Sequence, residues 1–163
     1  MAAFEFVARS RLASPAERVW EHASTMEGVN YELAPLLRMT HPPGIDRLDP
    51  SLAALGEPAF RSRVLLLGLI PVDYDDLTLV LVDVGRGFTE RSSLATQRLW
   101  EHERRIEPDG DAACELVDRI RHEPRVPVAA RHQSALLRQV FRHRHRRLRR
   151  RFGVRPRTPR SRS

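Results

Sequence analysis

Residues 128–152 read VAARHQSALLRQVFRHRHRRLRRRF, and this stretch decides the expected fold. Its apolar residues recur at steps of three and four, and they are Leu136, Leu137, Val140, Phe141, Leu148 and Phe152. At 3.6 residues per turn, this spacing places them on one side of a helix. Gly153 follows where a left-handed C-cap is expected. The sequence therefore predicts a long terminal helix whose apolar side needs a large apolar partner.

The partner of this helix is predicted from a run of β-like segments between residues 60 and 122. Five strands are expected there, at 60–69, 77–84, 88–94, 97–106 and 112–122. Asp109 and Gly110 separate the last two, and an Asp-Gly pair between alternating segments is typical of a β-hairpin. The short turns between these segments indicate antiparallel neighbours. Pro124 and Pro127 then end the sheet before the long helix.

The chain begins with alternating residues, from Phe4 to Arg11, that predict a first strand with one inward face. A helix start follows this strand. Ser14 is expected as the N-cap, Pro15 at the first helical position, and Glu17 as the residue that completes a capping box.

A second short helix is expected at 26–33, after a break around Gly28. Residues 34–40 predict a short strand, which ends at 41–44 because paired prolines and a glycine cannot continue a sheet interior. A loop with one helical turn near 51–55 leads to the strands described above. The order is a strand, two short helices, six strands and a long helix. A curved antiparallel sheet wrapped around the terminal helix would bury the apolar side of that helix.

The totals indicate one domain without a membrane segment. A length of 163 residues is enough for one substantial core and too short for two comfortable ones. No apolar run approaches the ~18 residues of a membrane span, and the N-terminus lacks the features of a signal peptide. We therefore expect a cytoplasmic protein with one domain at 1–153 and a disordered Arg/Pro/Ser-rich tail at 154–163.

Neither a disulfide nor a metal site is expected. Cys114 is the single cysteine, which excludes an intramolecular disulfide and a multi-cysteine zinc site. His143 and His145 are two residues apart on the predicted helix, roughly 200° around its axis, so they cannot bind the same ion. The sequence has no Gly-rich phosphate loop and no serine or cysteine nucleophile motif. We expect no cofactor.

The net charge of +7 is concentrated at the C-terminal end. Residues 142–163 contain eleven arginines and no acidic residue, whereas the rest of the chain has seventeen arginines and twenty-one acids, a net charge of −4. This end is a candidate surface for nucleic acid, an acidic protein or an anionic membrane. The complete absence of lysine points to a GC-rich genome, and aromatic residues for base stacking are absent after Phe152. Nucleic acid is therefore the less favoured partner.

Four segments carry a resemblance to a known superfamily. The run SPAERVW at 14–20, which follows the first strand, is similar to the opening of the START and polyketide-cyclase superfamily, abbreviated SRPBCC. Residues 100–104, 116–119 and 141–148 resemble a bacterial subgroup of it. That subgroup has a tryptophan-x-histidine strand, an aspartate on the last strand and an arginine in the final helix. The resemblance covers residues 3–152.

The resemblance implies an α+β helix-grip fold like that of the birch pollen allergen. In this fold a curved seven-stranded antiparallel sheet wraps around a long C-terminal helix, and two short helices follow the first strand. The resemblance also implies a cavity between the sheet and the helix that binds a hydrophobic small molecule, such as a lipid, a polyketide or a quinone-like compound. Cyclases and aromatases of the superfamily act on reactive chains held in this cavity.

A few polar residues are expected to point into this apolar interior. Trp100, His102 and Arg104 alternate along one predicted strand and therefore share one face. Asp118 lies on the neighbouring strand. If the two faces pair, Asp118 can reach His102 or Arg104, and it would remain ionised beside a guanidinium.

Arg144 is a further polar residue on the apolar side of the terminal helix. It lies three residues after Phe141 and four before Leu148. An inward arginine needs an acidic partner, for which Asp118 and Glu90 are the candidates. The candidate ligand-binding residues are therefore Tyr31, Glu90, Trp100, His102, Arg104, Asp118, Phe141 and Arg144.

Three interpretations of the protein are compatible with these residues. The one we adopt is a binding protein without turnover, in which the polar groups form a salt-bridge network that closes one end of the ligand cavity. The first alternative is an enzyme of the cyclase or aromatase type, with His102 and Asp118 as the proton-transfer pair. The second alternative is binding of nucleic acid or an acidic partner through the arginine-rich C-terminus.

Overall fold

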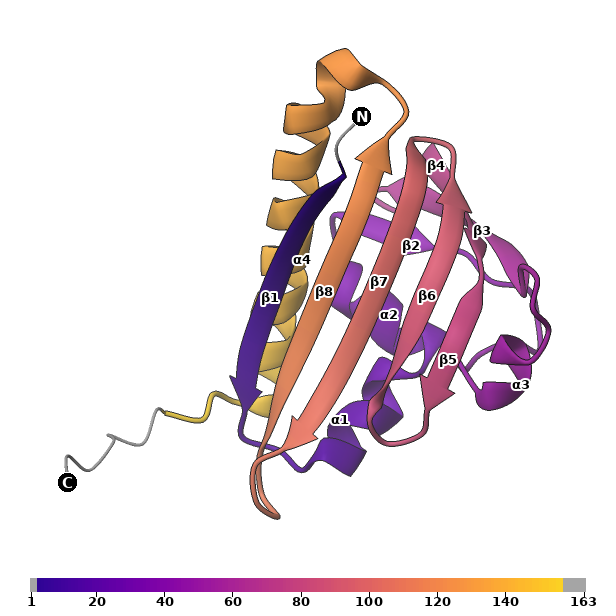
Figure 1. Cartoon of the computed structure of the whole chain (residues 1–163). Helices are drawn as coiled ribbons and strands as arrows, with labels where there is room; N and C mark the ends of the chain where they lie inside the picture. Colours follow the sequence, from indigo (N-terminus) through magenta and orange to yellow (C-terminus); the bar gives the residue numbers. More distant parts are fainter. Residues whose placement is uncertain (1–2, 157–163) are drawn as a thin grey trace.

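The computed structural model describes residues 3–156, which form a curved sheet with helices on one side (Figure 1). The strands are β1 Phe4–Leu12, β2 Leu37–Met39, β3 Phe60–Leu66, β4 Ile70–Leu77, β5 Leu79–Asp83, β6 Gly87–Leu94, β7 Gln97–Pro108 and β8 Cys114–Pro124. The helices are α1 Ala16–Ala23, α2 Met26–Leu33, α3 Pro50–Ala53 and α4 Ala130–Phe152, and a 3₁₀ turn at Pro127–Ala129 precedes α4.

The sheet is antiparallel throughout, with the strand order β1-β8-β7-β6-β4-β3-β2. β4 and β5 are separated by Thr78 alone, and both pair with β6, so they are two parts of one interrupted strand. Counted in this way, the sheet has seven strands. α4 runs along the β1 side of the sheet, and α1 and α2 lie behind it (Figure 1). The predicted α+β helix-grip fold is confirmed.

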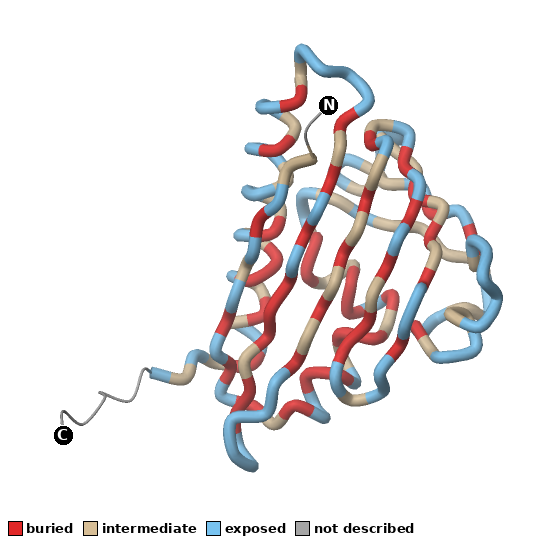
Figure 2. Tube along the Cα trace, in the orientation of Figure 1, coloured by how far each residue is buried: buried red, intermediate tan, exposed pale blue. Residues whose placement is uncertain are grey.

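Buried residues alternate along the strands and gather on one side of α4 (Figure 2). One apolar cluster packs α1 and the end of α4 against the sheet, and it includes Trp20, Leu116 and Leu148. A second cluster packs the middle of α4 against β1, β7 and β8 through Phe6, Trp100, Ile120 and Phe141. The long helix therefore buries its apolar side against the concave face of the sheet.

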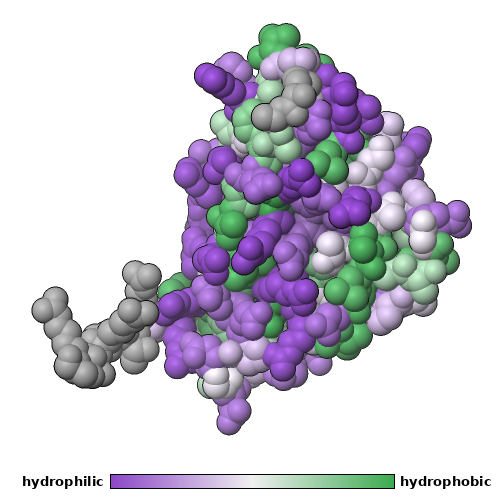
Figure 3. Space-filling model, viewed as in Figure 1, coloured by the Kyte–Doolittle hydropathy of each residue, from purple (hydrophilic) through white to green (hydrophobic). Residues whose placement is uncertain are grey.

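The face of the sheet that points away from the helices, here called the outward face, is largely hydrophilic (Figure 3). Ion pairs between adjacent strands cover it. Arg91 Nε lies 2.7 Å from Glu101 Oε1, and Arg121 Nη1 lies 3.3 Å from Glu101 Oε2. Exposed pairs of this kind contribute about 0–1 kcal/mol each. The outward face is therefore a solvated, charged surface.

The start of α1 differs from the prediction. Pro15, not Ser14, occupies the N-cap position, and no side chain forms a cap hydrogen bond there. The Ser14 hydroxyl is buried without a hydrogen-bond partner among the described residues. The predicted capping box is therefore wrong, because the helix begins one residue later than expected and Ser14 no longer faces the free N–H groups.

The second short helix has the predicted bounds, but the break before it lies at Ser24 and Thr25 rather than at Gly28. Thr25 is the N-cap of α2, and its hydroxyl accepts a hydrogen bond of 2.9 Å from the backbone N–H of Gly28. A Cβ atom on Gly28 would lie 1.9 Å from the carbonyl oxygen of His22. The glycine is needed for close approach between the two short helices.

β4 was not predicted as a strand, since the predicted strands end at Leu69, before Pro71, and resume at Leu77. The register between β3 and β4 shifts at this point, since Val64 pairs with Asp73 and Leu65 pairs with Pro71. Val72 is therefore an extra residue in a β-bulge. Proline is tolerated at bulges because its missing N–H is not required by the ladder.

The helix α4 ends at Phe152, directly before Gly153, as predicted. Gly153 has a φ of 76°, but its ψ of 167° lies outside the left-handed helical region, so the predicted left-handed C-cap is wrong. Val154 then forms a bridge with Leu12, and the N–H of Arg155 donates to the carbonyl of Arg11 over 3.2 Å. The predicted disordered tail, 154–163, thus starts with two residues that bind β1, and its last seven residues lie outside the described part. Within residues 3–156, no helix combines the length and the apolar character that crossing a membrane requires.

Replacing Gly28 with alanine tests the close contact of α1 and α2. Forced overpacking of this kind costs about 1–3 kcal/mol, and we expect the free energy of unfolding of Gly28→Ala to fall by this amount in urea denaturation. Glu27→Ala changes an exposed neighbour in the same helix and should alter stability by less than about 0.5 kcal/mol. Equal stability of the two variants would show that the short helices are not packed as described.

Candidate functional site

The centre of the molecule is a buried network of charged side chains on β7, β8, α2 and α4. Asp118 of β8 accepts four hydrogen bonds. Oδ1 receives them from His102 Nε2 at 2.9 Å and Arg104 Nε at 2.8 Å, and Oδ2 from Arg104 Nη2 at 2.8 Å and His145 Nε2 at 2.9 Å. The predicted contact of Asp118 with His102 or Arg104 is therefore confirmed, and both bonds form at once. Arg104 and Asp118 lie directly opposite each other in the β7–β8 ladder.

Glu32 of α2 is the second carboxylate of the network. Arg104 Nη1 and Nη2 bind its two oxygens at 2.8 and 2.9 Å, and Arg144 Nε and Nη2 bind Oε2 at 2.9 Å each. The predicted partners of Arg144, Asp118 and Glu90, were wrong. Arg144 reaches Glu32 instead, because α2 places this side chain between the sheet and α4.

The four charges of the centre balance, with two carboxylates against two guanidinium groups. Burial raises the pKa of Asp118, but the charge and hydrogen bonds of Arg104 outweigh it and hold that pKa well below its usual range. Burial acts on Glu32 in the same way, and Arg104 and Arg144 lower its pKa. Both acids are therefore ionised in the folded protein. A complete set of partners is what makes such buried charges tolerable.

His145 extends the network towards the opposite side of α4. Its Nε2 faces ionised Asp118 and donates to it, while Nδ1 lies 2.8 Å from the hydroxyl of Ser10. The same hydroxyl accepts a hydrogen bond of 2.9 Å from Arg149 Nη1. With a neutral ring, the donors run in one direction, from Arg149 through Ser10 and His145 to Asp118.

A second acidic cluster lies next to the network. Glu90 Oε2 is 3.8 Å from His102 Nδ1, and Ser92 Oγ donates to Glu90 Oε1 over 2.5 Å. Burial raises the pKa of Glu90, but the contacts with His102, Ser92 and Asp75 together outweigh burial, and the pKa is lowered. Burial and the neighbouring charge of Glu90 raise the pKa of Asp75 well above its usual range. We infer that this carboxyl pair holds one proton and that Asp75 carries it.

An apolar pocket of about 310 Å³, here called the β4 pocket, opens beside this cluster. β2, β3, β4, β7, the end of β6 and the first half of α4 surround it. Its walls are mainly apolar and include Leu33, Met39, Val64, Leu94, Val140 and Phe141. Asp75, Trp100 and Arg144 also border it, so the pocket has an apolar body and a polar inner end.

The candidate ligand-binding residues occupy three places. Trp100, Phe141 and Arg144 border the β4 pocket. Four further candidates lie behind the β4 pocket, in or beside the buried network. They are Glu90, His102, Arg104 and Asp118. Tyr31 lies at a separate surface depression beside the end of α4, where the guanidinium of Arg147 is 4.2 Å from its ring centre.

Three residues of the site were missed by the sequence analysis. Glu32 lies three residues after Val29, on the buried side of α2, and this acid on an apolar stripe was a usable signal. His145 is four residues after Phe141 on α4, so its inward position could also have been found. Asp75 could not, because its strand was not predicted.

The chain is similar to proteins of known fold. The model of a family described as "Domain of unknown function (DUF8410)" matches residues 10–152. The Zhui aromatase/cyclase from Streptomyces sp. R1128 is 12% identical with a TM-score of 0.66, over 90% of this chain and 92% of that chain. A START superfamily protein from Mycobacterium smegmatis is 12% identical with a TM-score of 0.64, over 91% and 96%. Ara h 8.0201 is 11% identical with a TM-score of 0.57, over 90% and 98%. Curated proteins give no match. These likenesses confirm the helix-grip fold.

Removing one charge tests the central network. Asp118→Asn leaves Arg104 with a buried charge that lacks one of its two partners, and breaking a buried pair in this way costs about 3–5 kcal/mol. We expect a fall of that size in the free energy of unfolding, measured by urea denaturation. Glu101→Gln is the control, because it removes the exposed pairs with Arg91 and Arg121 and should cost less than about 1 kcal/mol. Similar small losses in both variants would contradict a balanced buried centre.

The proton on Asp75 predicts a specific pH dependence. The pKa of Asp75 is higher in the folded protein than its unfolded value of about 3.9. At any pH between these two values, Asp75 is protonated in the folded state and ionised in the unfolded state. Stability from this group is therefore present below about pH 4 and is lost as pH rises, by about 1.4 kcal/mol per pH unit. Asp75→Asn removes this loss. Urea denaturation from pH 4.5 to 7 should show wild type weakening relative to the variant, and parallel curves would contradict the shared proton.

Proposed function

Because the chain belongs to the family described as "Domain of unknown function (DUF8410)" and has the helix-grip fold, we propose that it binds a hydrophobic small molecule in the β4 pocket. The ligand class is a lipid, polyketide or quinone-like compound. The START superfamily protein and the aromatase/cyclase among the similar structures support this class. The volume of about 310 Å³ lies at the lower end of the ~300–1,000 Å³ range of small-molecule pockets.

Exposed apolar side chains gather around this pocket, and they are the main support for the proposal. Two of its wall residues, Val72 and Leu136, are 46% and 65% exposed. The adjacent turn from β3 to β4 exposes Leu66, Leu67, Leu69 and Ile70. Soluble proteins rarely leave such a group of large apolar residues together without a function. A hydrophobic ligand would cover the inner part of this surface.

The polar inner end of the pocket is suited to orient the ligand. The raised pKa of Asp75 favours its uncharged form there, and Arg144 is already paired with Glu32. A charged ligand group would therefore gain little binding free energy here. A hydroxyl or carbonyl group, in contrast, can form a hydrogen bond at small desolvation cost. The favoured ligand has an apolar body that ends in one uncharged oxygen group.

The structure favours a binding function over catalysis in which His102 and Asp118 transfer a proton. All of the hydrogen-bonding atoms of the Asp118 carboxylate are engaged with Arg104, His102 and His145, and neither Asp118 nor His102 borders the β4 pocket. A proton-transfer pair must come within hydrogen-bond reach of the substrate. The pair is therefore better suited to hold the pocket wall in place than to act on a ligand.

Filling the pocket tests the proposal. Val140→Trp places a large ring in the β4 pocket, and Ala135→Trp adds the same ring to an exposed position of α4 outside it. The uncharged fluorescent probe N-phenyl-1-naphthylamine is titrated into both variants and the wild type. We expect one saturable site in the wild type, at least about tenfold weaker binding in Val140→Trp because the ring occupies the ligand volume, and less than about twofold change in Ala135→Trp.

Circular dichroism must first show that both tryptophan variants are folded. If the folded Val140→Trp variant binds the probe as well as Ala135→Trp does, the ligand site is not the β4 pocket. If the wild type shows no saturable binding, the proposed function itself is wrong.

A further inference from the structure

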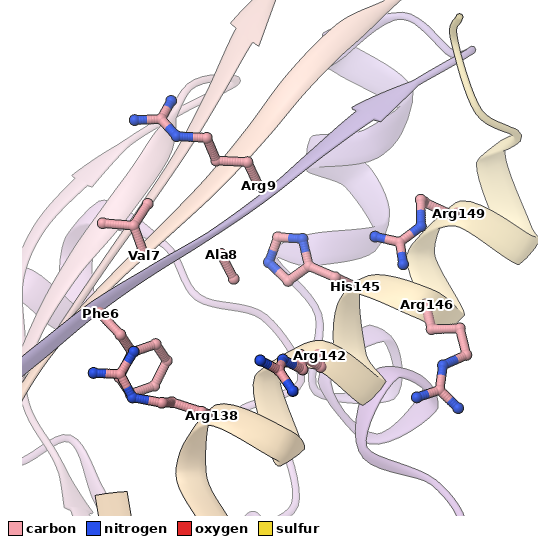
Figure 4. Close-up of a pocket in the computed structure, with 9 residues that line it drawn as sticks. All are labelled: Phe6, Val7, Ala8, Arg9, Arg138, Arg142, His145, Arg146 and Arg149. Atoms are coloured by element: carbon pink, nitrogen blue, oxygen red, sulfur yellow. The ribbon is translucent and has the colours of Figure 1, made fainter. Parts of the chain in front are cut away.

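A second recess lies on the other side of α4, between that helix and β1 (Figure 4). It has a volume of about 370 Å³ and is here called the arginine groove. Four arginines of α4 border it, and they are Arg138, Arg142, Arg146 and Arg149. Phe6 and Ala8 of β1 and His145 of α4 form its inner side, and within residues 3–156 no aspartate or glutamate lines it.

The four arginines follow one another on the same side of the helix at steps of four and three residues. Like charges at such spacing repel and destabilise an isolated helix by about 0.2–0.5 kcal/mol per pair. Arg142 and Arg146 are exposed, and neither forms an ion pair with another residue of the described chain. Glu5 precedes the groove residue Phe6 on β1, but its carboxylate pairs with Arg121 instead, with 3.3 Å between Glu5 Oε1 and Arg121 Nε. The groove therefore carries positive charge without an internal counterion.

Two of the guanidinium groups are held at the ends of the groove. Arg138 donates a 3.0 Å hydrogen bond to the backbone carbonyl of Glu5 and lies 5.1 Å from the ring centre of Phe6. Arg149 donates to the buried hydroxyl of Ser10. Figure 4 shows both side chains directed towards β1. Groups that are fixed before binding lose less entropy when a ligand arrives.

The inner wall of the groove is connected to the charged centre. His145 is 2% exposed and lies between α4 and β1, where Figure 4 shows its ring among the arginine side chains. Its bonds to Ser10 and Asp118 fix the ring in place. Because Asp118 is already engaged with Arg104 and His102, it has no free capacity to neutralise the groove.

We propose that the arginine groove binds a phosphate-type oxyanion, such as a phosphate ester or a diphosphate. Planar guanidinium groups bind phosphate oxygens through paired charge-assisted hydrogen bonds. One helical turn advances 5.4 Å, so successive arginines of the stripe can contact one tetrahedral group from two sides. The groove volume of about 370 Å³ favours one or two phosphate groups over a long polyanion. The site is independent of the β4 pocket.

Pyrophosphate titration by isothermal calorimetry tests this site. The double variant Arg142→Ala/Arg146→Ala removes the two exposed groove arginines, and Arg131→Ala/Arg150→Ala removes two exposed arginines of α4 that do not line the groove. Both variants lose the same charge, so a nonspecific effect weakens both equally. We expect one site per chain, at least about tenfold weaker binding in the groove variant, and less than about twofold change in the control.

Flotation with vesicles separates the two sources of a phosphate group. Vesicles that contain phosphatidic acid are compared with uncharged phosphatidylcholine vesicles. Retention on the acidic vesicles that is lost in the groove variant assigns the site to a lipid headgroup, whereas pyrophosphate binding without vesicle binding assigns it to a soluble phosphate compound. Both outcomes support the proposal.

Two results would overturn the proposal. They are the absence of saturable pyrophosphate binding, and equal weakening of binding in the groove variant and in its control.

Discussion

The whole structure depends on the way Arg104 holds two buried carboxylates. Its guanidinium contacts Asp118 in the adjacent strand and Glu32 in α2, and Glu32 in turn binds Arg144 of α4. The sheet, the short helix and the terminal helix are thus connected at one point. The hydrophobic effect brings these elements together, but it has no preferred direction. Charged groups that must all find partners fix their relative position, since any shift leaves a buried charge unpaired.

This charged centre also decides where the recesses of the molecule lie. It occupies the middle of the space that the sheet and α4 enclose, so the apolar volume is confined to the β4 pocket on one side. Arg144 and His145 are adjacent in α4 but serve opposite sides, since Arg144 borders the β4 pocket and His145 borders the arginine groove. Both are bonded to carboxylates of the same centre. One hydrogen-bonded network therefore supports the walls of an apolar recess and of a basic one.

The parts that could be predicted from sequence are those that depend on local periodicity. Alternation in two strands joined by a tight turn fixed which side chains share a face, and this was sufficient to bring Asp118 to Arg104. The partner of Arg144 was out of reach, because Glu32 is 112 residues away along the chain and its position depends on how α2 packs. β4 was missed for a similar reason. A strand with Pro71 near its start is stable only because a bulge in the partner register accommodates it.

Native mass spectrometry tests whether the β4 pocket holds a hydrophobic molecule. The wild-type protein and the Val140→Trp variant are incubated with a total lipid extract, separated from unbound lipid and measured under native conditions. We expect a one-to-one adduct of an uncharged, oxygen-containing apolar compound on the wild type that is absent from the variant. Equal adducts on both proteins, or an adduct on neither, would contradict binding in this pocket.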